Sequence, residues 1–456
     1  MFIMGMKMKI ALLICLSLGV IHTIRAQNQS SKGPNVILIL ADDMGLSDFS
    51  SVNGGLSRTP VLDGLRKESA WFNHAYSGSA VCAPARASLL TGKYPHRTGV
   101  VSLNMETEPE LTSLKKNEVT IADLFLQNGY QTGLVGKWHL GNRTDYHPMK
   151  RGFQEFAGFM EGETYYDFKL DINGTFKAFK GPYMTDVLTD YALKFIENHK
   201  SEPFFMHLAY KAPHRPLSAP EDIIDYYRKK GFDEKTSKVY AMIEVMDKGI
   251  GEVIKKLDDL GIRENTLIIF TSDNGPDPLA GNRFNLNLKG RKYDVTEGGI
   301  RVPLLFNWKG KLTPGNVDDL AHFTDMVPTL TNICKLRVSK DVSSSWDGRS
   351  LYPLLTAKQN ASLPSLRYWQ WNRGLPLYTH NAAVREGDWK LVRPAVSKDK
   401  VTGESDLKPL LFNIKNDPGE TQDISAANTE VYQRMKSLLD AWSKKMEAER
   451  LRNADR

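Results

Sequence analysis

Cysteine is scarce in this chain of 456 residues, and long apolar runs are missing beyond its N-terminus. Of the three cysteines, Cys15 lies in the N-terminal apolar stretch, so Cys82 and Cys334 alone belong to the main body of the chain. This count excludes a disulfide-rich scaffold and allows one disulfide between Cys82 and Cys334 in an oxidising compartment. No later segment reaches the about 20 apolar residues of a membrane span, so we expect no stable membrane insertion.

Arginine-rich tracts, internal repeats and low-complexity segments are also missing. Lysine and arginine number 60 against 53 aspartates and glutamates, which gives a net charge of +7 and a pI near 9.0. An excess this small over so long a chain is typical of a solvated surface, and it does not choose between nucleic acid, membrane and acidic sugar. Because no basic tract is present, we expect no nucleic acid partner.

The N-terminus has the pattern of a secretory signal peptide over residues 1–26. Lys7 and Lys9 precede an apolar run over residues 10–21, and cleavage is expected after Ala26. This pattern predicts an exported protein, either periplasmic or secreted.

Four apolar runs in the main body end in polar or charged residues. Near-continuous apolar runs of this kind favour strands in a sheet that is covered on both faces. The four runs are "NVILIL" before Asp42 and Asp43, "TLIIFTSDNG" with Asp273 and Asn274, "YQTGLVGKWHLG" with Lys137 and His139, and "PFFMHLAYKAPH" ending at His214; "VPLLFNW" from Val302 is a fifth strand candidate.

Helical patterns alternate with these strands. One helix is expected to begin at Pro60, another to run over 120–128, and a long one over 237–260. The alternation predicts an α/β fold. In open α/β sheets the ligand lies outside the carboxyl ends of the strands, where the polar residues gather here.

The acidic residues at the strand ends predict a metal site. Asp42, Asp43, Asp273 and Asn274 offer oxygen ligands, which Ca²⁺ and Mg²⁺ prefer, and a single Ca²⁺ is our first choice. Zinc would require His or Cys ligands, and Asn274 stands where a two-zinc phosphatase would be expected to have a histidine. Around the cation we expect a cationic ring that binds a compact oxyanion, made of Arg86, Lys137, His139, His214 and Lys292.

Cys82 is expected at the N-terminus of a helix that ends at Gly92, since Pro84 suits a first helical turn. The helix dipole there favours anions and is expected to lower the pKa of the thiol. Arg86, one turn further along, projects from the same face, so both side chains can meet one ligand.

At this point the sequence resembles a known family. Residues 82–86, "CAPAR", match the C-x-P-x-R signature of the type I sulfatases, and "SLLTG" follows. Further segments are similar to sulfatase segments in the same order: "ILADDMG", "GKWHLG", "APHRP", "TSDNG" and "KGRKYDVTEGGIRVP". The resemblance implies the alkaline-phosphatase-like fold, a large mostly parallel sheet sandwiched by helices.

The resemblance also implies a mechanism. A formylglycine-generating enzyme would oxidise Cys82 to formylglycine, whose hydrate attacks sulfur and releases the alcohol; the second hydroxyl then loses its proton and expels sulfate. Asp42, Asp43, Asp273 and Asn274 would hold Ca²⁺ together with this nucleophile.

The same resemblance implies a role for each cationic residue. Arg86 would steady the formylglycine hydroxyl, and Lys137 and Lys292 would bind sulfate oxygens, with Lys289 as the alternative to Lys292. His139 would assist the hydrate chemistry, while His214 would act as general acid on the leaving oxygen.

The pattern changes after about residue 355, so we expect a catalytic domain over 33–355 and a C-terminal α+β subdomain over 356–456. Short alternating stretches there predict a small antiparallel sheet, followed by a helix over 429–450. Core packing is the ordinary role of such residues, and sugar binding is the alternative. The sugar-binding candidates are Trp371, Arg373 and His380, with Trp369 and Asn372 beside them, His96 and Arg97 after the Cys82 helix, and, more weakly, Tyr165 and Tyr166.

These observations together predict an exported enzyme that removes sulfate from a sulfated carbohydrate such as a glycosaminoglycan or a mucin-type glycan. Two alternatives stay open. One is a phosphomonoester or phosphonate hydrolase on the same scaffold, and the other is a non-catalytic polyanion-binding protein with Cys82 paired to Cys334.

Overall fold

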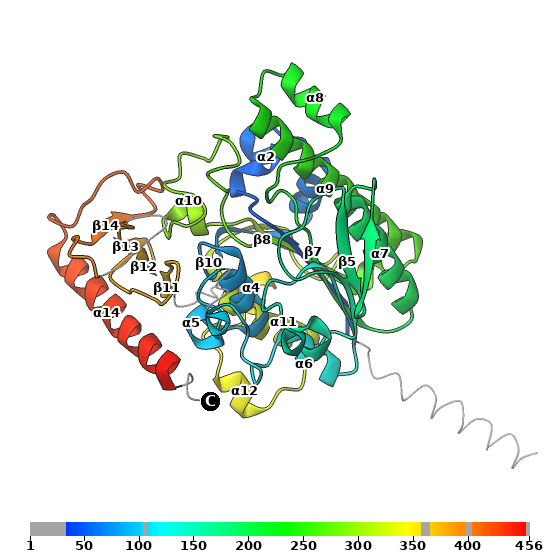
Figure 1. The fold of residues 1–456 in the computed structure, drawn as a ribbon. Helices are drawn as coiled ribbons and strands as arrows, with labels where there is room; N and C mark the ends of the chain where they lie inside the picture. Colours follow the sequence, from blue (N-terminus) through cyan, green and yellow to red (C-terminus); the bar gives the residue numbers. More distant parts are fainter. Residues whose placement is uncertain (1–32, 104–107, 357–364, 397–403, 453–456) are drawn as a thin grey trace, which may run out of the picture. The chain divides into compact units, whose positions relative to one another are not determined.

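A ten-stranded, mostly parallel sheet forms the centre of the computed structural model, which describes residues 33–103, 108–356, 365–396 and 404–452 (Figure 1). The strand order is β10-β2-β9-β8-β1-β7-β3-β4-β5-β6. The strands are β1 (Asn35–Ala41), β2 (Ala70–Tyr76), β3 (Gln131–Lys137), β4 (Glu155–Phe159), β5 (Phe168–Ile172), β6 (Thr175–Phe179), β7 (Phe204–Ala209), β8 (Thr266–Ser272), β9 (Leu304–Asn307) and β10 (Gly315–His322).

Strand β1 lies in the middle of the sheet and pairs in parallel with β7 on one side and β8 on the other. Its seven residues are all buried, and they alternate between the two faces. Val36, Leu38 and Leu40 belong to one hydrophobic core, while Ile37 and Ile39 belong to the other. This two-sided burial explains why the strand reads as a continuous apolar run.

Helices cover both faces of the sheet. The face that receives Val36 packs on α4, α6 and α11, and the face that receives Ile37 packs on α3, α7 and α9, while α8 packs on the outside of α9 (Figure 1). The main helices are α3 (Pro60–Lys67), α4 (Cys82–Thr91), α6 (Ile121–Gln127), α7 (Met184–His199), α8 (Glu221–Lys229), α9 (Glu234–Asp259) and α11 (Met326–Cys334). The shorter ones are α2 (Ser50–Asn53), α5 (Pro95–Thr98), α10 (Glu297–Ile300), α12 (Lys340–Ser344) and α13 (Tyr352–Leu355).

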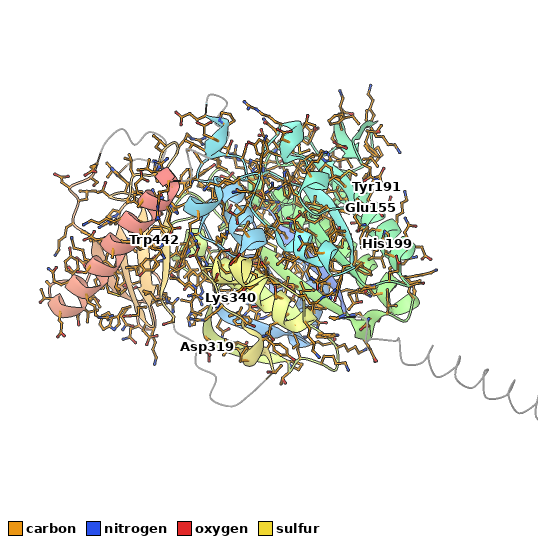
Figure 2. All side chains as sticks on the ribbon, turned by 90° about the horizontal axis from the view of Figure 1, so that it is seen from below. Glu155, Tyr191, His199, Asp319, Lys340 and Trp442 are labelled. Carbon is orange, nitrogen blue, oxygen red and sulfur yellow. The ribbon has the colours of Figure 1, made fainter. Side chains whose placement is uncertain are left out.

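The long helix α9 begins three residues before the predicted start at Ser237. Asp233 causes the difference, because its carboxylate accepts hydrogen bonds from the backbone N–H groups of Lys235 and Thr236 and so caps the helix. Helix α7 is attached to the sheet at its C-terminal end, where the last helical residue, His199, contacts Glu155 of β4 at 2.6 Å (Figure 2).

A second, four-stranded antiparallel sheet follows, with the order β11-β12-β13-β14. It consists of β11 (Arg367–Gln370), β12 (Ala382–Glu386), β13 (Trp389–Arg393) and β14 (Leu410–Asn413), and α14 (Thr429–Arg452) packs on it. Trp442 of α14, labelled in Figure 2, stacks on Tyr368 of β11 with ring centroids 5.1 Å apart. The predicted fold class, a large mostly parallel sheet with a small α+β part after it, is confirmed.

A fully buried charge cluster joins the small sheet to the large one. Lys390 of β13 lies 2.9 Å from a carboxylate oxygen of Glu297 on α10 and 3.0 Å from one of Glu420, and all three side chains are buried. Tyr76 of β2 donates to Glu297 at 2.7 Å and receives a hydrogen bond from Arg385 of β12. These contacts hold the short helix α10 between the two sheets.

The predicted signal peptide lies outside the described residues. Among the helices that are described, none is long and apolar enough to cross a membrane.

Replacing Lys390 with methionine should destabilise the fold by about 3 kcal/mol or more, because two buried glutamates lose their ammonium partner. Urea unfolding followed by circular dichroism measures this change. Lys444→Met, on the exposed side of α14, is the matched control and should stay within about 0.5 kcal/mol of the parent. A loss below about 1 kcal/mol for Lys390→Met would contradict the role of the cluster.

Candidate active site

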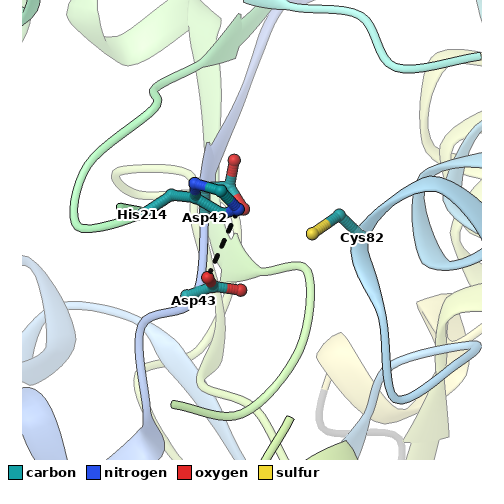
Figure 3. A group of neighbouring side chains, drawn as sticks. All are labelled: Asp42, Asp43, Cys82 and His214. Carbon is teal, nitrogen blue, oxygen red and sulfur yellow. Dashed lines mark ion pairs between the residues drawn. The ribbon is translucent and has the colours of Figure 1, made fainter. Parts of the chain in front are cut away.

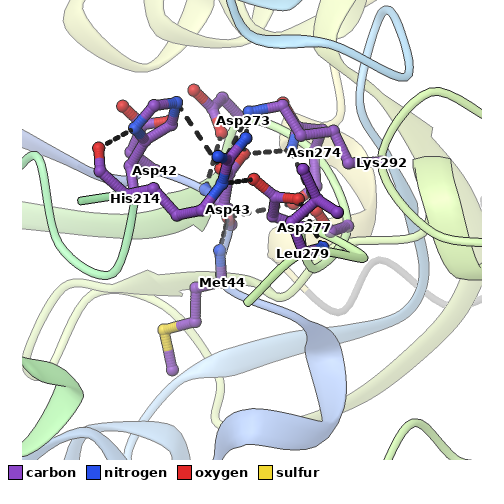
Figure 4. A network of polar contacts seen from close by, with 12 residues as sticks. Asp42, Asp43, Met44, His214, Asp273, Asn274, Asp277, Leu279 and Lys292 are labelled. Atoms are coloured by element: carbon purple, nitrogen blue, oxygen red, sulfur yellow. Dashed lines mark hydrogen bonds and ion pairs between the residues drawn. The ribbon is translucent and has the colours of Figure 1, made fainter. Parts of the chain in front are cut away.

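Strands β1, β3, β7 and β8 run parallel, so their carboxyl ends meet at one edge of the sheet. This edge gathers the polar residues that follow the strands. Asp42 and Asp43 follow β1, Asp273 and Asn274 follow β8, and His214 lies in the loop after β7 (Figures 3 and 4). Lys137 is the last residue of β3.

Three buried carboxylates meet three buried cations there. Lys137 Nζ lies 2.5 Å from Asp42 Oδ2, and Lys292 Nζ lies 2.7 Å from Asp43 Oδ1. The guanidinium of Arg86 contacts Asp273 at 2.8 Å and Asp42 at 3.4 Å. Each of these six side chains is at most 4% exposed, so the charges offset one another away from water.

The pKa values of these groups differ according to their partners. Burial acts to raise the pKa of Asp42, but Lys137, His214 and Arg86 outweigh it and hold the pKa well below the usual range. Burial, together with the charge of Asp42, raises the pKa of Asp273 to about 7. Burial acts to lower the pKa of Lys292, yet Asp43 raises it well above the ordinary value. At neutral pH Asp42 is therefore a carboxylate and Lys292 an ammonium ion.

Asp43 has a left-handed backbone, with φ of 68°. A non-glycine residue in this conformation costs free energy, which the surroundings must offset. Arg283 does so from the loop after β8, since its Nη2 donates to Asp43 O at 3.3 Å while it forms a buried ion pair with Asp48. Asp273 adds a contact by accepting from Asp43 N at 3.1 Å. The turn that presents Asp43 is thus held from two sides.

Cys82 is the first residue of α4, as predicted, and its side chain is 1% exposed. The predicted lowering of its thiol pKa is wrong. Burial raises the pKa far above the usual value and outweighs Lys137 and Lys292, which act in the opposite direction. The predicted alternative of a disulfide is wrong as well, because Cys82 and Cys334 are both free and buried. The structure therefore presents Cys82 as a buried neutral thiol.

Side chains of Asp42, Asp43, Cys82 and His214 converge, with one ligand atom from each lying within 4.8 Å of the others (Figure 3). Two oxygen atoms in this region are available to coordinate a cation. Asp42 Oδ1 and Asn274 Oδ1 are buried and lack a hydrogen-bond partner among the described residues. Orphaned oxygens of this kind, beside two more carboxylates, form a donor set that suits a hard divalent cation. His214 also lies in this group, which the predicted ligand set did not include.

The two predicted catalytic histidines are both in the site. His214 Nε2 lies 3.7 Å from Asp43 Oδ2, and its Nδ1 lies 2.7 Å from the carbonyl oxygen of Arg215. Burial lowers the pKa of His214 to about 4, and that of His139 well below its ordinary value. His139 follows β3 with a left-handed φ of 63°. In the protein alone both rings are therefore neutral at pH 7.

The structure places Lys292 in the site rather than Lys289. Lys292 N donates to Pro276 O at 3.1 Å, which anchors its loop beside the end of β8. Lys289 instead donates to Glu420 O at 3.2 Å and lies over the ring of Phe412, toward the small sheet.

His96 and Arg97 lie beyond the far end of α4, which carries them away from Cys82. His96 is 3% exposed, contacts Gln370 at 2.9 Å and packs on the ring of Trp442. Arg97 pairs with Asp347 at 2.8 Å and with Glu449 of α14. These contacts join α5 to the C-terminal helix.

The predicted sugar-binding residues of the C-terminal part lie in strand β11 or in the loop between β11 and β12. Trp371 is buried beside Tyr293, which follows Lys292, with ring centroids 5.5 Å apart. The exposed Arg373 donates to Leu103 O at 3.0 Å, and His380 is 2% exposed. Trp369 and Asn372 are buried, and Trp369 donates to Ser77 O at 2.8 Å.

Lys211 is a buried residue of the site that the predicted set lacks. It follows β7 within the same "YKAPH" stretch that carries His214. Its position after a strand of the site, three residues before a candidate histidine, is a signal that could have marked it. Tyr165, a weak sugar-binding candidate, also reaches His214, since its hydroxyl donates to His214 O at 2.9 Å, whereas Tyr166 packs on Tyr183.

With this geometry established, comparison with known proteins identifies the class. The Sulfatase family model matches residues 34–334, and the model for the N-sulphoglucosamine sulphohydrolase C-terminal region matches residues 291–447. The chain belongs to the sulfatase family and is a sulfuric ester hydrolase.

Individual relatives agree with this assignment. Arylsulfatase J of Mus musculus is 30% identical and aligns with 90% of this chain and 76% of its own length. N-acetylgalactosamine-6-sulfatase of Canis lupus familiaris is 29% identical over 87% of this chain and 83% of its own. The structure of Ps i-CgsB in complex with k-i-k-neocarrahexaose is 30% identical with a TM-score of 0.80, covering 90% of this chain and 93% of its own.

In protein made without a maturing enzyme, Cys82 and Cys334 should both resist alkylation by iodoacetamide until the chain is unfolded. The thiolate is the reactive form, and burial raises the pKa of both thiols, that of Cys334 to about 12. Mass spectrometry of native and urea-treated samples counts the modified cysteines. Rapid modification of Cys82 in the native protein, or a mass two hydrogens lower that marks a disulfide, would contradict this geometry.

Proposed function

We propose that this protein hydrolyses sulfate esters of a carbohydrate through a formylglycine made from Cys82. The observation that carries the proposal is the position of Cys82, at the start of α4 and within 4.8 Å of the ligand atoms of Asp42, Asp43 and His214. The formylglycine hydrate would supply a hydroxyl nucleophile where the cysteine now lies. A formylglycine-generating enzyme is the partner that this maturation requires.

Ca²⁺ is the cation that we propose for the acidic cluster. Asp42, Asp43, Asp273 and Asn274 would hold it, and the orphaned oxygens of Asp42 and Asn274 support this choice. A bound Ca²⁺ would polarise the sulfate oxygens and add positive charge for an anionic ester.

The remaining charged residues would bind and orient the ester. Lys137 and Lys292 contact Asp42 and Asp43, the two carboxylates grouped with Cys82, and their ammonium groups would bind sulfate oxygens. Arg86 reaches Asp273 and Asp42 from α4, one turn after Cys82, and would steady the nucleophile's hydroxyl. His139 would assist the hydrate chemistry, and His214 Nε2 would give its proton to the leaving oxygen.

A sulfated sugar is the proposed substrate class. Relatives named for N-acetylgalactosamine-6-sulfate and a solved relative holding k-i-k-neocarrahexaose support a carbohydrate ester, of the glycosaminoglycan or mucin type. Trp371, Arg373 and His380, from the loop between β11 and β12, are the residues that we propose for sugar contacts. We further propose that the chain is exported after cleavage behind Ala26, on the pattern of its first 26 residues.

Protein made beside a formylglycine-generating enzyme should carry an aldehyde or its hydrate at residue 82, and its N-terminal peptide should begin at Gln27 after export.

Cys82→Ala should lower the turnover of 4-nitrophenyl sulfate by at least about 10⁴-fold while the fold is kept, since the nucleophile is lost. Peptide mass spectrometry and a steady-state assay measure both. A plain thiol in active enzyme, or preference for 4-nitrophenyl phosphate, would refute the proposal.

Removing metal with EDTA should abolish activity, and Ca²⁺ should restore it. Ca²⁺ should also raise the thermal midpoint of the metal-free protein, because binding at 100 times Kd stabilises the fold by about 2.7 kcal/mol. Asp42→Asn should weaken this shift strongly, whereas Asp222→Asn, an exposed residue of α8, should leave it unchanged. An equal shift in Asp42→Asn and the parent would place the cation elsewhere.

A further inference from the structure

A buried ammonium group beside His214 has no part in the chemistry described so far. Lys211 follows β7, and it is 2% exposed. In the described part of the chain no carboxylate lies within ion-pair distance of its Nζ, although Asp42 and Asp43 are near enough to act on its charge. An unpaired buried charge costs free energy, so a specific contact must account for its retention.

That contact is a backbone carbonyl shared with His214. Lys211 Nζ donates to Arg215 O at 2.6 Å, and His214 Nδ1 lies 2.7 Å from the same oxygen. Nζ and Nδ1 are 3.5 Å apart. Because a carbonyl oxygen only accepts, the hydrogen-bond network assigns a proton to Nδ1 and leaves Nε2 as the nitrogen that faces Asp43.

Tyr165 completes the enclosure of the two residues. Lys211 Nζ lies 4.9 Å from the centre of its ring, and the Tyr165 hydroxyl donates to His214 O. Tyr165 is itself 1% exposed, so it is a rigid support. The ammonium therefore ties the two ends of the turn from Lys211 to Arg215 together, with His214 inside that turn.

We propose that Lys211 is a positioning residue that fixes the tautomer and the orientation of His214. By holding Arg215 O against Nδ1–H, it keeps Nε2 as the nitrogen that exchanges the catalytic proton. The proposal rests on the proposed function, in which His214 protonates the leaving oxygen. As the bond between sulfur and the leaving oxygen breaks, its electron pair stays on that oxygen, which takes the Nε2 proton. The negative charge of the bound ester favours the protonated ring, so His214 takes the Nε2 proton from solvent when the ester binds. After the transfer His214 is again a neutral imidazole with its proton on Nδ1.

Lys211→Met should reduce activity in proportion to the need for a proton on the leaving group. In the mature, Ca²⁺-loaded enzyme, we expect kcat/KM for phenyl sulfate to fall about tenfold or more. The value for 4-nitrophenyl sulfate, whose phenolate leaves without a proton, should change less than about threefold. Adding Lys211→Met to His214→Ala should cause no further loss, since Lys211 acts through His214.

Lys115→Met is the matched control. Lys115 is a half-buried lysine whose Nζ also donates to a backbone carbonyl, that of Arg97, at 2.9 Å, but it lies outside the site. The Lys115→Met variant should keep the parent kcat/KM for both esters. Equal losses for both esters in Lys211→Met would assign Lys211 a merely structural role and overturn the proposal, as would full additivity with His214→Ala.

A spectroscopic measurement separates this proposal from the proposed function. Nitrogen-15 NMR of histidine-labelled enzyme, with the His214 signals identified by their loss in His214→Ala, reports which ring nitrogen carries the proton. We expect Nδ1–H in the parent and a mixture of tautomers in Lys211→Met. An unchanged tautomer in Lys211→Met would overturn the role of Lys211. If His214→Ala slows the hydrolysis of both esters equally, His214 is not the acid of the proposed function. The tautomer measurement by itself then tests the role of Lys211.

Discussion

The structure depends on offsetting several charges that the fold has removed from water. At the carboxyl edge of the parallel strands, Asp42, Asp43 and Asp273 meet Lys137, Lys292 and Arg86, all within a few per cent of complete burial. Each charge would be costly alone, so the three strands, the helix α4 and the loop that carry them must be placed together. These charges are arranged before any ligand binds, which is the preorganisation that hydrolysis of a sulfate ester requires.

The same constraint extends to the small C-terminal sheet. Lys390 and Glu420 from that part of the chain hold Glu297 of α10, and α10 follows directly on the loop that carries Lys292. Trp371 packs against Tyr293 in that loop. The small sheet therefore supports, through buried contacts, the loop that carries Lys292. A substitution in β13 can therefore change the position of Lys292 without any contact with a bound substrate.

Much of the fold was predictable because its strands are buried on both faces and its helices carry local start and stop signals. The run from Asn35 to Leu40 and the polar residues after it predicted both β1 and its place beside the site. Quantities that depend on packing were not predictable in this way. A helix N-terminus lowers the pKa of an exposed thiol. Cys82 is buried under other side chains, and this burial raises its pKa instead. His96 and Arg97 are close to Cys82 in sequence, yet a full helix separates them in space.

The sequence by itself determined the α/β class, the acidic strand ends, the Cys82 to Arg86 motif and the family, because these features depend on local patterns and on the order of short segments. Only the tertiary structure decided that Lys292 rather than Lys289 enters the site, that Cys82 and Cys334 stay apart, and that Lys211 shares a carbonyl with His214. These outcomes depend on distances between residues far apart in the chain or on the path of a loop, and residue order alone does not contain them.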